Sequence, residues 1–571
     1  MSHDVLLQRW MVGIVAGIVI ILLAFWSKAN KSSAFLKEAR AYSRDATAPQ
    51  SWPSVGSTPN FVPPLPQKIC AGWCPPRISA LDRVVRNIDC TSHNIQEHLR
   101  AALQMENCAS AIQSEQNARE VETKLLKLAE NDAFTFFRGA AGFFNVDLMC
   151  MDPNFVGKKR EMPRVVSNGD AHPENFGTQV MVNGKLMWGV NDFDQSFPTP
   201  FSWDLKRGAT GMQVACRARG WNDVVCKASV NAFVGAYMDI AARHNISNIY
   251  VSNQDRYVEG SRASDAAPLL VNVFKRARKA ETDEEVLRWL RDDLNVDTER
   301  DRFFETAVTT PLPDEVVPEF QAAIEAYLFH GVPAVVMYPF GEFWKVLAVA
   351  KRKGSGTGSI GLNRFYVLLR GKKSTYGGRI VVEMKQEVHS LLESFFRFKI
   401  TLSEQGKRAV DAERGAYPYT NPFYGWTIYK DHAYVIREKS KHEKSIRLSD
   451  LTAEEYLDFS VLCGRALAMY HFKMRCDDHY CNLDDVAAVD RETWSSVAEY
   501  IQDYGPEAFR SMVTSFAFRE TERQIEAWDW LRTTVRQTKA RGESPLWLLN
   551  FQLPGNDDCA QSNNIAPRMS G

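Results

Sequence analysis

Two short stretches of the sequence, joined by a predicted hairpin, decide how the chain is interpreted. Residues 167–177 read SNGDAHPENFG, and residues 190–194 read VNDFD. Two apolar runs lie between them and are joined by Asn-Gly at 183–184, the dipeptide that favours a type I′ hairpin turn. The hairpin returns the second acidic stretch to the first, so we expect Asp170 and Asn175 to lie beside the acidic residues that follow it.

The residue types in these two stretches suit phosphoryl transfer. That reaction needs a carboxylate to accept the proton of the attacking hydroxyl, and it needs oxygen ligands that hold Mg²⁺ against nucleotide phosphates. We expect Asp170 to be the catalytic base, Asp192 to be the main metal ligand, and Asn175 and Asp194 to complete the metal site. An Asx-type turn is the structural alternative for Asp170 and Asn175, but it leaves the hairpin and the spacing of Asp192 unexplained.

The same residues carry a resemblance to known families. GDAHPEN followed by NDFD resembles the H-G-D-x-x-x-x-N…D-F-[DE] signature of choline kinases and aminoglycoside phosphotransferases. PFSWDL at 200–205 is similar to the D-P-x-x-D-L segment that opens a core helix in those enzymes, and this resemblance implies that Asp204 buttresses the catalytic loop. The chain departs from the pattern at Asn168, where most relatives have His, which leaves open what supports the loop from within.

A longer pattern resembles the uncharacterised bacterial family DUF2252. It comprises FFRGAAGFFNVDL from Phe136, GDAHPENFG, NDFDQSFPTPFSWDLKRGA and YVIREKSKHEKS from Tyr434, and it covers about residues 85–535. Together the resemblances imply an α+β, protein-kinase-like fold of two lobes, with ATP and Mg²⁺ as cofactors and a small-molecule acceptor that carries a hydroxyl group. Arg138, within FFRG, either contacts phosphate or caps a helix.

A glycine-rich segment lies much later in the chain. Gly356, Gly358 and Gly361 form a single GxGxxG pattern. A dinucleotide fingerprint would lead into a helix, whereas the NRFYVLL that follows these glycines is typical of a strand. We therefore expect the glycines to join two strands and to cover nucleotide phosphates with their backbone NH groups, as a kinase glycine-rich loop does. A plain glycine-rich hairpin is the alternative.

The next predicted strand, 379–385, ends on a lysine that is placed to bind phosphate. Lys385 leaves the strand on the face opposite its apolar side chains, so it can neutralise phosphate charge. The structural alternative is an exposed strand lysine. A kinase-like site also needs a glutamate on a neighbouring helix to pair with this lysine, and Glu413 is our first choice and Glu393 our second.

The order of these segments predicts a circular permutation. In an ordinary kinase the glycine loop and the lysine precede the catalytic loop, but in this chain they follow it. The helix that leads into the catalytic loop should then come last, and CGRALAMYH at 463–471 has the expected pattern. Apolar residues repeat there with helical spacing, and Thr452 and Glu455 can cap the start of the helix. The hypothesis requires Lys385 to lie within a nucleotide's length of Asp192.

The N-terminal segment predicts a membrane protein. Residues 10–27 begin WMVGIVAGIVIILLAFW, which carries no charge and would rise about 25 Å as a helix. Basic residues are denser after it than before it, so the positive-inside rule predicts a single-pass anchor with a cytoplasmic body. A cleaved signal peptide, which would export the body, and a buried helix are the alternatives. The eleven scattered cysteines are expected to be small buried hydrophobes rather than a disulfide framework.

Composition excludes some classes and divides the chain. Lys+Arg and Asp+Glu both number 69, so the net charge is zero and a polybasic nucleic-acid binder is excluded. The predicted parts are an N-terminal tail at 1–9, the transmembrane anchor at 10–27, a basic and Pro-rich tether at 28–80, the catalytic-loop part of the C-lobe at 81–250, a helical insertion at 251–340, N-lobe-like strands at 341–440, C-terminal helices that complete the C-lobe at 441–540, and a tail at 541–571.

The leading functional hypothesis is a membrane-anchored phosphotransferase that depends on ATP and Mg²⁺, and AMP transfer is a chemical variant of the same site. A pseudokinase that binds nucleotide or acts as a scaffold is one alternative, and it would bind nucleotide without turnover. A metal-dependent hydrolase is another, and its activity would not depend on Lys385.

Overall fold

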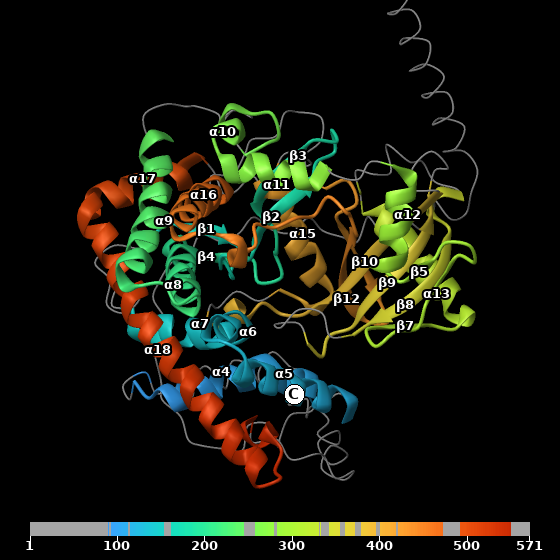
Figure 1. The fold of residues 1–571 in the computed structure, drawn as a ribbon, viewed down its shortest axis with the longest axis horizontal. Coiled ribbons are helices and arrows are strands. Elements are labelled where there is room, and N and C mark those ends of the chain that lie inside the picture. The colour runs from blue at the N-terminus through green and yellow to red at the C-terminus, as the bar shows by residue number, and fades with distance from the viewer. Residues whose placement is uncertain are drawn as a thin grey trace, which may run out of the picture. The chain divides into compact units, whose positions relative to one another are not determined.

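A six-stranded antiparallel sheet and a group of long helices form the described part of the chain (Figure 1). All of the described residues belong to one compact unit, Pro59–Gly571. Helices and strands are both extensive in it, so the expected α+β class is confirmed. The computed structural model describes residues 90, 93–111, 115–152, 162–244, 257–278, 282–330, 332, 342–353, 360–371, 378–395, 400–417, 421–471 and 491–549.

The large sheet is built from the second half of the chain. Its strands are β7 (Thr309–Pro311), β8 (Val346–Arg352), β9 (Arg364–Arg370), β10 (Arg379–Glu387), β11 (Gly425–Tyr429) and β12 (His432–Glu438). Their order in the sheet is β11-β12-β10-β9-β8-β7, and every neighbouring pair is antiparallel. The helix α15 (Gln405–Ala416) comes between β10 and β11 in the chain and packs against β11 and β12.

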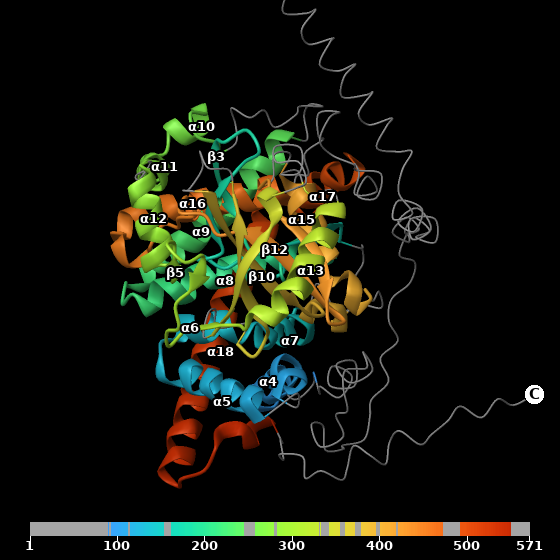
Figure 2. The ribbon, with the colours of Figure 1, turned by 90° about the vertical axis from the view of Figure 1, so that its right-hand side faces the viewer.

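Alternating side chains give this sheet two different faces. The even-numbered residues within Ile380–Met384 of β10 enter an apolar core that α13 (Val317–Phe329) covers, and Figure 2 shows α13 lying across the strands. On the other face, α12 (Asp283–Asp292) packs against apolar residues of β8, β9 and β10. Because a shift of one residue would reverse the two faces, the apolar pattern fixes the register and directs Lys385 away from the α13 core.

Four long helices pack against one another in the other main part of this unit. They are α8 (Ser202–Ala218), α9 (Asp223–His244), α16 (Ala453–His471) and α18 (Pro506–Ala540). The predicted apolar repeat is buried in α16, and Thr452 and Glu455 form the predicted capping box. Gly464 allows α16 to approach α9 closely, because a Cβ there would lie 2.1 Å from the carbonyl oxygen of Phe233.

By length and composition, one described helix is able to cross a membrane. This helix is α9, but 61% of its apolar window is buried in the protein, and it packs against α8, α16 and α18. It is therefore a core helix of this fold. The predicted anchor at 10–27 and the tether at 28–80 lie outside the described residues, as do Gly356 and Gly358.

The predicted hairpin is present, but its turn differs from the expected one. β2 (Phe176–Val180) pairs antiparallel with β3 (Leu186–Val190). Gly184 has a φ of +77°, whereas Asn183 is not among the residues with positive φ, so the turn is not type I′. The backbone NH of Gly184 donates to the carbonyl of Met181, and the NH of Met181 donates to Lys185. This is a three-residue loop that ends on a left-handed glycine, the second common way to close a hairpin.

Other elements complete the described chain. β1 (Arg164–Ser167) pairs with β4 (Phe197–Pro200). Both ends of the segment 164–200, which contains the two motifs, therefore lie together. The interval 251–340, predicted to be helical, also contributes three short strands, and β7 extends the large sheet. The remaining elements are α4 (Ile95–Ala111), α5 (Glu115–Glu130), α6 (Ala133–Gly139), α7 (Ala141–Met151), β1 (Arg164–Ser167), β4 (Phe197–Pro200), α10 (Arg262–Asp265), α11 (Pro268–Arg278), β5 (Val296–Asp297), β6 (Arg302–Phe303) and α17 (Arg491–Tyr504).

The expectation that the cysteines are all unpaired is wrong. Cys90 forms a disulfide bond with Cys150, near the end of α7, and Cys216 of α8 forms one with Cys226 of α9. Cys463 is free and buried in α16, as expected of a small hydrophobic residue. The sequence did not reveal the two bonds because the partners are brought together by packing, and their spacing, 60 and 10 residues, follows no known motif.

Candidate active site

The loop 168–175 joins β1 to the hairpin, and a buried carboxylate holds its backbone. Asp204, in the first turn of α8, accepts hydrogen bonds from the backbone NH groups of Asn168 at 2.5 Å and Gly169 at 2.9 Å. Gly169 has a φ of +81°, and a Cβ there would lie 2.2 Å from the carbonyl oxygen of Gln195. Only glycine fits this position without a shift of the backbone, and Asp204 buttresses the loop.

The C-terminal end of α16 reaches the same carboxylate. Nε2 of His471 lies 3.1 Å from Oδ2 of Asp204, and Nδ1 of His471 lies 2.8 Å from the hydroxyl of Tyr237 on α9. His471 and Asp204 are both buried, and 267 residues separate them in the chain. The helix predicted to lead into the catalytic loop therefore ends directly beside it.

Asn168 supports the loop from within. Its side-chain oxygen accepts a hydrogen bond from the backbone NH of Asp170 at 3.2 Å, and its side-chain nitrogen donates to the carbonyl of Asp192. One buried amide thus ties the loop to the acidic segment after the hairpin. Asparagine in place of histidine does not leave the loop unsupported, because it has both a donor and an acceptor.

A buried arginine, which the sequence did not identify, holds Asp170. Nε and Nη2 of Arg207 donate to Oδ1 of Asp170 at 3.0 and 2.8 Å, and Nη2 also donates to the carbonyl of Phe137 at 2.8 Å. The guanidinium carbon lies 3.7 Å from the ring centre of Phe137. Burial raises the pKa of Asp170, and the charge and hydrogen bonds of Arg207 offset part of that rise. The other oxygen, Oδ2, is left as the free one, 3.7 Å from Nε2 of His172.

Asn175 and Arg138 are neighbours of Asp170. The side-chain nitrogen of Asn175 donates to the carbonyl of Asp170 at 2.9 Å, which leaves the acceptor of the amide to face a ligand. Arg138, in the last turn of α6, forms an ion pair with Glu174 of the loop. Its positive charge offsets part of the rise that burial causes in the pKa of Asp170.

Lys385 of β10 meets the acidic segment after the hairpin. Its Nζ forms an ion pair with Oδ2 of Asp194 and lies 3.7 Å from Oδ1 of Asp192. This contact spans 191 residues of sequence. The requirement that Lys385 lie within a nucleotide's length of Asp192 is met.

The two carboxylates beside Lys385 titrate differently. Partial burial, reinforced by the charge of Asp194, raises the pKa of Asp192 to about 6. Burial acts in the same direction on Asp194, but the charge and hydrogen bond of Lys385 outweigh it and hold the pKa of Asp194 below its usual value. Lys385 therefore favours the ionised form of Asp194 more strongly than that of Asp192.

The oxygen atoms of this segment are of the type that a hard cation takes. The carboxylate oxygens of Asp192 and Asp194 and the amide oxygen of Asn175 are donors that suit Mg²⁺, with water completing its shell. Within the described ranges, no group of three His, Cys, Asp or Glu side chains is arranged to hold a metal by itself. A cation at these residues would therefore need further oxygen ligands from water or from a bound phosphate.

The helix α15 contributes a residue other than the predicted glutamate. Arg408 donates from Nη2 to the carbonyl of Asp194 at 2.7 Å and from Nη1 to the carbonyl of Ser196 at 2.7 Å. Burial alone would lower the pKa of Lys385. The carboxylates of Asp192, Asp194 and Glu387 outweigh burial, so this pKa is raised.

The structure also gives the positions of the two predicted glutamates and of one predicted glycine. Glu413 is buried on α15 and lines a cavity described below. Glu393 lies outside α15 and pairs with His389 at 2.9 Å. Gly361, the one predicted glycine that the structure describes, lies between β8 and β9 with a φ of +93°. Gly361 therefore lies between two strands, as expected, whereas Gly356 and Gly358 lie outside the described residues.

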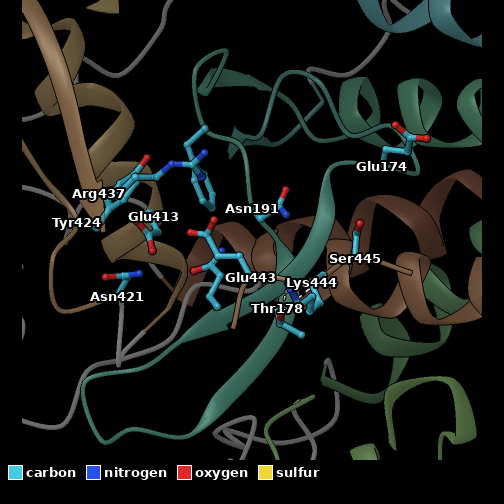
Figure 3. A pocket seen from close by; sticks show the side chains of 12 residues that line it. Glu174, Thr178, Asn191, Glu413, Asn421, Tyr424, Arg437, Glu443, Lys444 and Ser445 are labelled. Carbon is cyan, nitrogen blue, oxygen red and sulfur yellow. Dashed lines mark hydrogen bonds between the residues drawn. The ribbon is translucent and has the colours of Figure 1, made fainter. Parts of the chain in front are cut away.

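A cavity of about 180 Å³ adjoins the acidic segment (Figure 3). Its lining comes from the loop and hairpin, from the acidic segment, from α15 and its following loop, and from β12 and the chain after it. Sequence analysis did not predict it, because these segments are far apart in the chain. Its lining residues are Glu174, Thr178, Gln179, Asn191, Phe193, Glu413, Asn421, Tyr424, Arg437, Glu443, Lys444 and Ser445.

Comparison with known proteins identifies the family. No curated protein and no solved structure matches the chain. A family model described as an uncharacterised protein conserved in bacteria, DUF2252, matches residues 116–533. The match includes both motifs, Arg207, Lys385 and the whole large sheet. Because it spans more than half of the sequence, the chain belongs to the DUF2252 family.

Proposed function

We propose that this protein transfers a phosphoryl group from a nucleoside triphosphate to a hydroxyl group of a small-molecule acceptor, with Mg²⁺ as cofactor. The observation that carries the proposal is the contact of Lys385 with Asp192 and Asp194. It lies beside the loop in which Arg207 holds Asp170. Segments far apart in the sequence supply the base, the oxygen ligands and the phosphate-binding cation that this reaction needs.

The order of elements supports a circularly permuted kinase-like fold as part of this proposal. β8, β9 and β10 are followed by α15, β11 and β12, and then by α16. α16 ends at His471, beside Asp204 and the loop 168–175, which comes from the first half of the chain. In space the chain thus runs from the lysine strand through α16 to the loop, which is the kinase order with the chain cut between α16 and the loop.

Each residue then has a defined role. Asp170 accepts the proton of the attacking hydroxyl at Oδ2, since Arg207 occupies Oδ1. Asn175 donates to the carbonyl of Asp170 and would offer its side-chain oxygen to the metal, and Lys385 exchanges its contact with Asp194 for phosphate oxygens. Mg²⁺, when bound, neutralises charge on the transferred phosphate. We propose that the segment 10–27 anchors this domain to a membrane.

The test is phosphate transfer by the purified full chain. γ-Labelled nucleotide, Mg²⁺ and a metabolite extract are incubated with the protein, and labelled products are separated and identified. We expect Asp170→Asn to lower transfer by about 10²- to 10⁴-fold while nucleotide still raises the melting temperature. Asp314→Asn, at an exposed carboxylate in a 3₁₀ turn, is the matched control.

The same assay separates the alternatives. Transfer that survives in Asp170→Asn contradicts the role of Asp170. Nucleotide binding with no labelled product from any extract indicates a pseudokinase. Metal-dependent hydrolysis that is unchanged in Lys385→Ala indicates a hydrolase that uses the acidic residues without a nucleotide.

A further inference from the structure

The cavity beside Lys385, Asp192 and Asp194 is lined by one side chain that can only donate hydrogen bonds and by another that can only accept them. Arg437 of β12 and Glu443 both line it, and 31% and 27% of their side chains are exposed. Arginine has N–H donors and no acceptor, whereas an ionised carboxylate has acceptors and no donor. A ligand held between them needs acceptors on one edge and donors on the next.

Arg437 and Glu443 influence each other without forming an ion pair. Nε of Arg437 donates to Glu383 at 2.9 Å, and Glu443 lies 3.5 Å from Nζ of Lys439. No nitrogen of Arg437 lies within 4.0 Å of a carboxylate oxygen of Glu443, both of which the structure describes. Burial alone would lower the pKa of Arg437, but the charges of Glu383 and Glu443 hold it above its ordinary value. A positive and a negative side chain therefore line one cavity without a direct ion pair between them.

The position of the cavity connects it to the phosphate site. Glu383, which holds Arg437, precedes Lys385 by two residues and lies on the same face of β10. Asn191 and Phe193, which line the cavity, flank Asp192 in the acidic segment. A nucleotide whose phosphates lie at Lys385 and Asp192 can therefore place its base in this cavity.

We propose that this cavity recognises a guanine base, so that the phosphate donor is GTP rather than the ATP that the family resemblance implies. Guanine offers two acceptors, O6 and N7, to Arg437. Its N1–H and 2-amino donors then face the two carboxylate oxygens of Glu443. Adenine has an amino donor in place of O6 and an acceptor at N1, so it would set donor against donor and acceptor against acceptor. This inference rests on the proposed function, because it assigns the base of the proposed donor.

The experiment compares nucleotides on the unmodified full chain. Binding of GTP, ATP, ITP and 7-deaza-GTP is measured by calorimetry in Mg²⁺ buffer. We expect GTP to bind at least about tenfold more tightly than ATP, the cost of one mismatched buried polar group. ITP lacks the 2-amino donor and 7-deaza-GTP lacks the N7 acceptor, so each should bind more weakly than GTP.

Two variants assign the preference to its residues. Arg437→Gln and Glu443→Gln should each bring the GTP-to-ATP ratio towards one, and the exposed pair Arg288→Gln and Glu284→Gln should leave it unchanged. If ATP binds as tightly as GTP, the base assignment is wrong while the proposed function stands. If no nucleotide binds, the proposed function itself fails. A preference for GTP that persists in both cavity variants overturns the roles of Arg437 and Glu443.

Discussion

Asp170 and Asp192 are carboxylates of one candidate site, but they differ in their partners and in how much of each side chain is exposed. Asp170 accepts two hydrogen bonds from Arg207, 37 residues away, and 19% of its side chain is exposed. Asp192 shares Lys385 with Asp194, and 44% of its side chain is exposed. A helix therefore holds Asp170 through Arg207, whereas a strand of the large sheet holds Asp192 and Asp194 through Lys385.

This difference has a consequence for mutagenesis. The contacts that hold Asp170 and its loop come from Arg207 and Asp204 of α8, and Lys385 is not among them. Under the proposed function, a substitution at Lys385 should weaken nucleotide binding without releasing Asp170.

The largest effect on stability is expected at Arg207. Arg207→Met removes the partner of Asp170 and the donor to the Phe137 carbonyl, and we expect the free energy of unfolding to fall by about 3 kcal/mol. Urea unfolding followed by circular dichroism measures this. Arg219→Met, at an exposed arginine one residue beyond α8, should change it by less than about 0.5 kcal/mol. Equal losses in the two variants would contradict the buried-pair argument.

A smaller effect, on binding alone, is expected at Lys385. Lys385→Met removes the cation that faces the proposed phosphates, and we expect the affinity for the Mg²⁺–nucleotide complex to fall by about 10- to 100-fold. Calorimetry measures the affinity, and Lys345→Met, at an exposed lysine just before β8, is the control. Unchanged affinity in Lys385→Met would place the phosphates elsewhere.

The acidic pair should also make binding depend on pH. Because the pKa of Asp192 is raised to about 6, this residue is protonated below that pH and cannot bind a cation. Affinity for Mg²⁺ should therefore rise about tenfold as the pH increases from about 5 to about 7, and the dependence should vanish in Asp192→Asn.

The contribution of Asp192 to folding stability should change with pH in the opposite direction to the Mg²⁺ affinity. A raised carboxyl pKa means that the folded state binds the proton more tightly than the unfolded state does. The contribution of Asp192 is therefore largest below its unfolded pKa and is lost as the pH rises towards about 6. A melting temperature that rises with pH in the parent, and no longer does so in Asp192→Asn, would contradict the raised pKa of Asp192.

A smaller effect on stability than at Arg207 is expected at Asn168. Asn168→Ala removes one hydrogen bond within the loop and one that ties it to the acidic segment, and we expect a loss of about 1–2 kcal/mol in unfolding free energy. Asn168→His tests whether the residue of the kinase signature can replace the amide. If Asn168→Ala is as stable as the parent, the two side-chain hydrogen bonds of Asn168 do not stabilise the fold.

Spacing along the chain predicted the parts of this site that local structure brings together. Asp170, Asn175 and Asp192 were found because a hairpin of known length lies between them. Lys385 was found because strand alternation fixes which side chains share a face. These signals act over a few residues or one hairpin, and the sequence contains them in full.

The residues that were missed depend on packing between distant elements. Arg207 and Arg408 lie on helices whose sequences contain several other basic residues, and nothing local marks which one will point at Asp170 or at Asp194. The cavity and the disulfide bonds were missed for the same reason. The hairpin turn was assigned to the wrong type because Asn-Gly fits more than one loop length.

The two disulfide bonds also make the compartment of this domain testable. Such bonds persist in oxidising compartments and are rare in the reducing cytoplasm. Alkylation of the chain purified without reductant should leave Cys90, Cys150, Cys216 and Cys226 unlabelled, and that result would favour export of the domain; full labelling would favour a cytoplasmic body. An exported domain would have to obtain its phosphate donor on a side of the membrane where nucleotides are scarce, and its rate in the cell would then be set by supply rather than by affinity.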